Sequence, residues 1–153
     1  GLFDNVNSRV AGIAGQVGVR ESRRIHGEYM LTNEDVLSHR KFSDAVARSN
    51  YPIDVHGHKL RNQEIVSEEN TAPYYEIPYR CMVPVGVDGL LVAGRCISSE
   101  FVAQSSLRIQ PTARALGEAA GIAAAMAVRD GSEVRAIRGE DVRAEMLRRG
   151  ARF

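Results

Sequence analysis

The segment that most constrains the fold is a run of residues dominated by Ala, at positions 111–131. Pro111 suits the first turn of a helix, where a missing N–H costs no hydrogen bond, and Gly131 suits a C-cap. The segment therefore predicts one long helix. The small side chains that recur along one face of it are Ala113, Gly117, Ala120, Gly121 and Ala124. That face predicts close packing of the helix against a sheet.

The remainder of the chain mixes extended segments with helices. The extended segments expected are 18–25, 51–56, 74–84 and 90–93. Thr32 and Asp35 form a capping box, which predicts a helix from residue 33 to about residue 47. An amphipathic pattern predicts a last helix over about 140–149. This order is not a regular βαβαβ series, so the predicted fold class is mixed α/β (α+β), with residues 1–153 forming a single domain or fragment.

Composition excludes several classes of partner. The formal net charge is +1 and no basic patch is interleaved with aromatic residues, so we expect no nucleic-acid partner. No apolar run approaches the roughly 20 residues that span a bilayer, so we expect no membrane partner. Cys81 and Cys96 form neither a CxxC pair nor a metal-ligand spacing. They are typical of two reduced, partly buried thiols in a cytoplasmic protein.

Motifs of most stand-alone enzymes are missing. The chain carries no Walker A sequence, no HExxH and no GxSxG. Gly12, Gly15 and Gly18 stand before a predicted strand, whereas a dinucleotide-binding fingerprint follows a strand. His56 and His58 have no further ligand cluster nearby, so we expect no metal site.

Two places in the chain suit a ligand. Gly94 follows the apolar run 90–93 and permits close backbone approach, and Arg95 offers a charged hydrogen-bond fork. Taken alone, this spacing favours the alternative, a strand that ends in a turn with a surface arginine. The start of the long helix, preceded by Arg108, favours an anionic or electron-rich group because a helix N-terminus carries partial positive charge. A Pro-initiated helix beside a solvated arginine is the alternative.

Polar side chains suited to a substrate cavity lie elsewhere. Tyr79, Arg80 and the segment 54–56 are the candidates, and His56 is a proton donor or acceptor because its ordinary pKa lies near neutrality. A lone histidine is more often structural, and that alternative stays open. Tyr79, Arg80 and His56 are the predicted catalytic residues.

Six segments in this order resemble a known family. They are RESRRIHGEY at 20–29, YPIDVHG at 51–57, YEIPYR at 75–80, LVAGRCIS at 91–98, LRIQPT at 107–112 and ALGEAAG at 115–121. Together they resemble the C-terminal part of FAD-dependent oxidoreductases of the glutathione-reductase-like flavoprotein class, over about residues 18–128. The resemblance implies the second piece of a two-part FAD-binding fold that lacks the N-terminal dinucleotide-binding βαβ unit.

The resemblance also implies a cofactor and partners. FAD would contact the region of about 90–128. The residues implied to bind it are Gly94, Arg95, Arg108, Pro111, Thr112 and Gly117. Flavin would take a hydride or electrons from a small-molecule substrate, and a missing N-terminal flavoprotein segment would complete the site. We expect the chain alone to be incomplete and to associate as a homo-oligomer. The alternative is a folded, non-catalytic fragment or interaction domain that binds no flavin.

Overall fold

The structure is a computed structural model, and it describes residues 11–55 and 73–153. This part of the chain contains four α-helices and one two-stranded antiparallel sheet, joined by short 3₁₀ turns. In chain order the elements are α1 (Asn33–Leu37), β1 (Ala45–Ser49), β2 (Tyr75–Pro78), α2 (Phe101–Leu107), α3 (Gln110–Asp130) and α4 (Gly139–Arg148). The 3₁₀ turns are Tyr79–Met82, Gly94–Cys96 and Val134–Ala136. The mixed α/β class is confirmed at this level.

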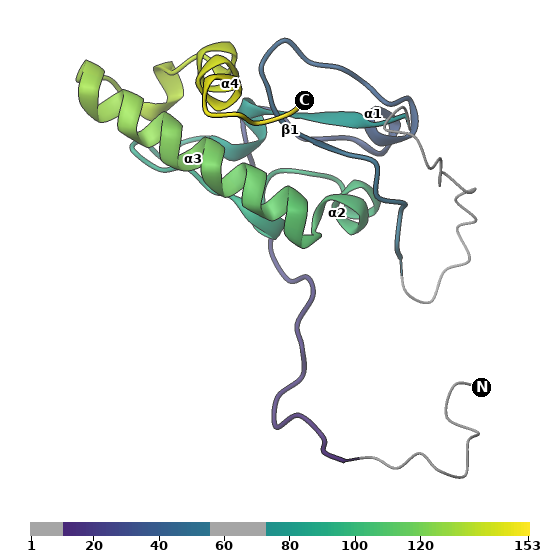
Figure 1. Ribbon diagram of the computed structural model, residues 1–153. Helices are drawn as coiled ribbons and strands as arrows, with labels where there is room; N and C mark the ends of the chain where they lie inside the picture. The colour runs from purple at the N-terminus through teal and green to yellow at the C-terminus, as the bar shows by residue number, and fades with distance from the viewer. Residues whose placement is uncertain (1–10, 56–72) are drawn as a thin grey trace.

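The sheet is small, and helices supply much of the hydrophobic core that packs against it. β1 and β2 pair with Ala47 opposite Ile77, and α3 and α4 both pack against β1 (Figure 1). Side chains of the sheet and the two helices are completely or almost completely buried where they meet, among them Val46, Ile77, Leu116, Val142 and Met146. Burial of this apolar surface stabilises an arrangement that two strands could not hold alone.

The long helix forms as predicted. Pro111 lies in its first turn, and Gly131 ends it in the left-handed conformation with φ 62°. The prediction that its small-residue face packs closely against a sheet is wrong for the described residues. A Cβ added at Gly117 or Gly121 would meet nothing within 4 Å. The buried face of α3 is instead the one that carries Leu116 and Ile122.

Other predictions about local structure are also wrong. The capping box at Thr32 is present, but the helix it opens ends at Leu37, and residues 45–49 form β1 instead. His39 takes φ 55°, which stops the helix and turns the chain. Residues 90–93 do not form a strand, since Gly89 and Gly94 have φ of 65° and 83° and the segment has no strand partner in the described chain.

The extended segment expected at 74–84 forms only in part, because β2 passes into the 3₁₀ turn Tyr79–Met82 after Pro78. Of the extended segment 51–56, residues 51–55 are described and form no strand. The last helix, α4, matches its predicted range to within one residue at each end. Cys81 is buried and Cys96 is exposed, and both are free thiols.

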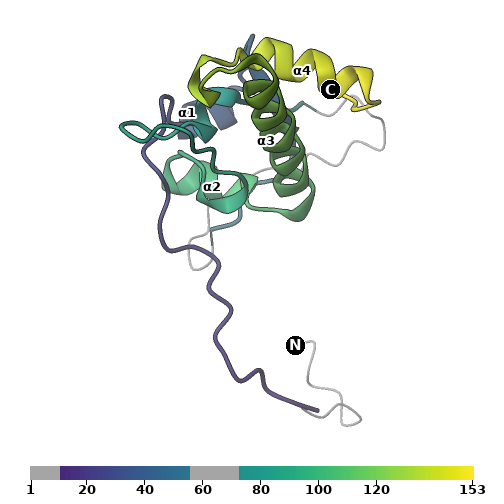
Figure 2. The same ribbon diagram turned by 90° about the vertical axis from the view of Figure 1, so that its left-hand side faces the viewer.

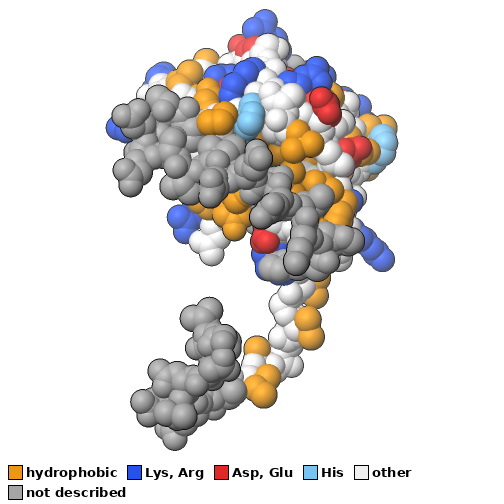
Figure 3. All heavy atoms as spheres, turned by 90° about the vertical axis from the view of Figure 1, so that its right-hand side faces the viewer, with side chains coloured by type: hydrophobic (Ala, Val, Ile, Leu, Met, Phe, Trp, Pro, Cys, Tyr) orange, Lys and Arg blue, Asp and Glu red, His pale blue; other side chains and the backbone are white. Residues whose placement is uncertain are grey.

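The first described residues lie apart from the body. Residues 11–24 form no strand. Residues 11–17 are exposed, and Figure 2 shows the beginning of this segment running away from the helices. Ile13 and Val17 are 90% and 89% exposed, and hydrophobic side chains are visible along the segment in Figure 3. The predicted strand at 18–25 is therefore absent from the structure. Among the described helices, none is long and apolar enough to cross a membrane.

Candidate functional site

Two of the predicted cofactor-binding residues meet in one cavity of about 480 Å³, which we call the α3 pocket. It lies where α3 begins, and Ile109 and Gln110 form part of its wall. The polar side chains that line it are Arg20, Arg95, Arg108, Asp54, Tyr51, Ser105 and Gln110. Three arginines beside one carboxylate make this a positively charged pocket.

Arg108 is the most buried of the three arginines. It caps the C-terminus of α2 and precedes α3, and its side chain is only 10% exposed. Its guanidinium donates one hydrogen bond, of 3.2 Å, to the carbonyl of Asp54, and it lies 3.8 Å from the Asp54 carboxylate. A guanidinium has five N–H donors. Most of the donor capacity of Arg108 is therefore left for a group in the α3 pocket.

The backbone around the pocket is held by three polar side chains of α2. Gln104 donates to the carbonyl of Arg95 at 3.2 Å, and Ser105 accepts from the N–H of Asp54 at 3.1 Å. Ser106 donates to the carbonyl of Tyr51. All three are buried, with at most 4% of their surface exposed. Buried polar groups are normally hydrogen bonded, and these three tie distant segments to one helix.

The other predicted cofactor residues lie near the α3 pocket but do not all reach it. The turn that contains Gly94 packs on α3, where Gly94 faces Ala113. Pro111 is exposed in the first turn of α3 and Thr112 is buried beside it. Gly117 lies further along the helix with open space around it. The N-terminus of α3 has no side-chain cap, and of its first three residues Gln110 and Thr112 carry a backbone N–H whereas Pro111 has none.

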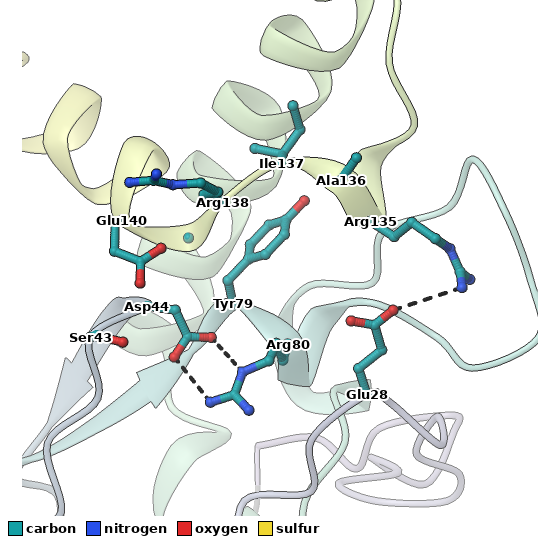
Figure 4. Close-up of a pocket in the computed structure, with 11 residues that line it drawn as sticks. Glu28, Ser43, Asp44, Tyr79, Arg80, Arg135, Ala136, Ile137, Arg138 and Glu140 are labelled. Carbon is teal, nitrogen blue, oxygen red and sulfur yellow. Dashed lines mark hydrogen bonds and ion pairs between the residues drawn. The ribbon is translucent and has the colours of Figure 1, made fainter.

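Tyr79 and Arg80 line a different pocket, of about 310 Å³ (Figure 4), which we call the Tyr79 pocket. Arg80 forms a two-pronged ion pair with Asp44, at 2.8 and 3.2 Å. Across the same pocket Arg135 lies 3.8 Å from Glu28. Arg80 and Arg135 are therefore each paired with a carboxylate of the same pocket.

The Tyr79 hydroxyl is also satisfied within the protein. It donates a 2.8 Å hydrogen bond to the carbonyl of Val134. Burial, with a smaller contribution from the negative charge of Glu28, raises the pKa of Tyr79 well above its ordinary value. The phenol therefore stays neutral at physiological pH. These contacts favour a structural role for Tyr79 and Arg80, and their part in catalysis stays a prediction.

Sequence reasoning missed part of the site. His56 lies outside the described residues. Asp54, expected to join Tyr79 and Arg80 at a substrate cavity, lies beside Arg108 in the α3 pocket instead. Ser105 and Gln104 carried no signal, because a Ser or Gln in a short helix is ordinary. In the described ranges, no three His, Cys, Asp or Glu side chains gather as metal ligands.

Comparison with known proteins assigns the family. The family model described as FAD dependent oxidoreductase matches residues 3–146 of this chain. The chain therefore belongs to the FAD-dependent oxidoreductase family. No curated protein and no solved structure matches it.

Proposed function

We propose that the α3 pocket forms part of the flavin site of an FAD-dependent oxidoreductase. The observation that carries this proposal is Arg108, a nearly buried cation whose guanidinium borders a cavity at the start of α3. A cavity of this size is in the range of small-molecule and cofactor sites. The cationic walls and the partial positive charge at the N-terminus of α3 suit an oxygen-rich ring edge such as the pyrimidine edge of a flavin.

Bound FAD would supply hydride or electron transfer, from a small organic substrate to an acceptor. The residues of this chain would hold and polarise one edge of the ring. Arg108 and the first N–H groups of α3 would stabilise negative charge there, because both present positive charge that is fixed before the ligand arrives. Arg95 would contribute a second cation, with its backbone carbonyl held by Gln104.

The pyrophosphate of FAD would need a second segment. Such a group is normally held by a glycine-rich turn between a strand and a helix N-terminus, and the sequence offers none in that context. We propose that an N-terminal flavoprotein segment supplies this turn, as in a two-part FAD-binding fold of the glutathione-reductase class. The open face of α3 at Gly117 and Gly121 supports the proposal, since it has room for a packed neighbour.

A titration followed by visible absorption tests the proposal. The chain alone is expected to be nearly colourless as purified and to perturb the spectrum of added FAD only weakly, because half of the cofactor lacks its contacts. If the absorption spectrum of added FAD stays that of free FAD at every concentration, the result would contradict flavin binding by this chain and favour the folded, non-catalytic alternative. Stoichiometric, tightly bound FAD would contradict the proposed need for a second segment.

A further inference from the structure

We propose that Asp54 determines which ligands the α3 pocket accepts. Its carboxylate competes with a bound oxyanion for Arg20 and Arg108, and this competition weakens the binding of a dianion more than the binding of a monoanion. This inference rests on the proposed function only in taking the α3 pocket as a binding site. It concerns the charge of the ligand and holds for any oxygen-rich occupant.

The positions of the three side chains carry the argument. One oxygen of the Asp54 carboxylate lies 3.5 Å from Arg20 and 3.8 Å from Arg108. Both arginines line the pocket, and Asp54 is the single acidic residue among its described lining residues. At these separations the carboxylate is close enough to attract both cations, but its contact with Arg108 is too long for a hydrogen bond. An incoming anion would meet cations that are already partly neutralised.

The backbone of Asp54 is anchored at both its N–H and its carbonyl group. The backbone N–H of Asp54 is bound by Ser105, whose own hydroxyl donates to the carbonyl of Val102 at 2.7 Å. The backbone carbonyl of Asp54 accepts from Arg108. Both contacts survive when the side chain changes, so Asp54→Asn removes one negative charge while the anchors of residue 54 remain.

The effect on a ligand depends on the charge that the ligand brings. Electrostatic repulsion from the carboxylate is proportional to ligand charge, so a dianion is disfavoured by about twice the free energy of a monoanion. Removing the carboxylate should therefore help a dianion more. Because part of the pocket is open to solvent, the gain should shrink as ionic strength rises.

Anion titrations of the full chain, followed by backbone amide NMR shifts around residues 105–110, test this inference. The probes are sodium nitrate as the monoanion and sodium sulfate as the dianion, at matched ionic strength. In Asp54→Asn we expect nitrate affinity to rise about threefold and sulfate affinity about tenfold. The matched control is Asp130→Asn, which makes the same change in net charge at the far end of α3.

Each result decides the inference. A gain for sulfate that exceeds the gain for nitrate, seen in Asp54→Asn and not in Asp130→Asn, supports it. Equal gains in the two variants, equal gains for the two anions, weaker binding in Asp54→Asn or no binding in any protein overturns it. No flavin enters the experiment, so it can succeed even if the FAD titration above fails.

Discussion

At Arg108 the fold keeps a positive charge almost out of water, and the Asp54 carboxylate neutralises it only in part. Burying an arginine is unfavourable unless its N–H groups find acceptors, and here they find one carbonyl and a carboxylate 3.8 Å away. The free energy of unfolding that this burial costs is explained if a bound ligand accepts the remaining hydrogen bonds of Arg108. Arg80 differs in this respect, because Asp44 already binds it with two hydrogen bonds.

Replacing Arg108 should change the redox behaviour of flavin bound in the complete protein. Reduced flavin carries negative charge at its pyrimidine edge, and a nearby guanidinium stabilises that charge. We expect Arg108→Ala to lower the flavin reduction potential, by the equivalent of about 1–3 kcal/mol. Potentiometric titration measures it, with Arg138→Ala as a control because Arg138 lines the Tyr79 pocket. An unchanged potential with flavin fully bound would remove Arg108 from the flavin site.

Acid should weaken the fold through Asp35, which is 1% exposed. Burial disfavours its charged form, but hydrogen bonds from Thr32, Tyr29 and Arg40 outweigh burial and lower the pKa of the carboxyl. A lowered folded-state pKa gives stability that is present above the ordinary pKa of about 3.9 and is lost as pH falls through the folded value. Asp35→Asn should cost about 2 kcal/mol at neutral pH. Urea unfolding should show this difference shrinking below about pH 4; a difference independent of pH would contradict the assignment.

Single residues of the site are predictable only where their neighbours in the sequence provide a local context. Arg108 precedes a helix opened by Pro111, and this neighbourhood is visible without a structure. Asp54 and Arg108 are 54 positions apart, and the Arg108 guanidinium donates to the backbone carbonyl of Asp54. A contact to a backbone carbonyl cannot be predicted from residue types. The hydroxyl of Ser105 meets Asp54 over a similar separation. Contacts of this kind depend on tertiary packing.

At the scale of elements, α4 is docked through a glycine. A Cβ at Gly139 would lie 2.7 Å from the Cβ and carbonyl oxygen of Asp44, and 2.8 Å from the Cβ of Tyr79. We expect Gly139→Ala to lower the free energy of unfolding by about 1–3 kcal/mol through overpacking. Gly117→Ala is the matched control on α3, where the added methyl meets nothing. It should raise stability by about 0.5–1 kcal/mol, because Ala favours a helix interior.

Chemical denaturation of the two variants measures both effects. If Gly139→Ala is as stable as the wild type, α4 does not approach Asp44 as closely as the structure has it. If Gly117→Ala destabilises the chain, another part of the protein packs against this face of α3. The close packing that the sequence predicts for the small-residue face would then be correct.

Helices whose ends and periodicity are visible in the sequence are predictable. Elements whose conformation depends on a distant partner strand are not. α3 and α4 carry their own starts, stops and periodicity. The sequence predicts the second half of a helix where β1 forms, because the apolar residues of β1 continue the spacing begun in α1. Its strand state depends on β2, about 30 positions away in sequence, as the pairing of Ala47 with Ile77 shows. Residues 90–93 have strand-like composition, but the described chain provides no strand beside them.

At the scale of the whole molecule, two surfaces of the described residues are exposed and rich in small or apolar side chains. One is the small-residue face of α3 that includes Gly117 and Gly121, and the other is the segment with Ile13 and Val17. Exposed apolar surface of this kind favours association. We expect the isolated chain to form dimers or higher oligomers in light scattering. Gly121→Arg should shift the population toward monomer by placing a charge on the α3 face, and an unchanged mass in this variant would exclude that face as the contact.

The most direct test of a flavin site at the α3 pocket is FAD binding compared between Arg108→Ala and Arg138→Ala, followed by flavin fluorescence. Each variant removes one guanidinium, but only Arg108 lines the α3 pocket. We expect weak binding by the wild type and by Arg138→Ala, and an affinity at least about tenfold lower in Arg108→Ala, because a charge-assisted hydrogen bond is lost. Equal affinities in the two variants, or a wild-type chain that leaves flavin fluorescence unchanged, would contradict the account.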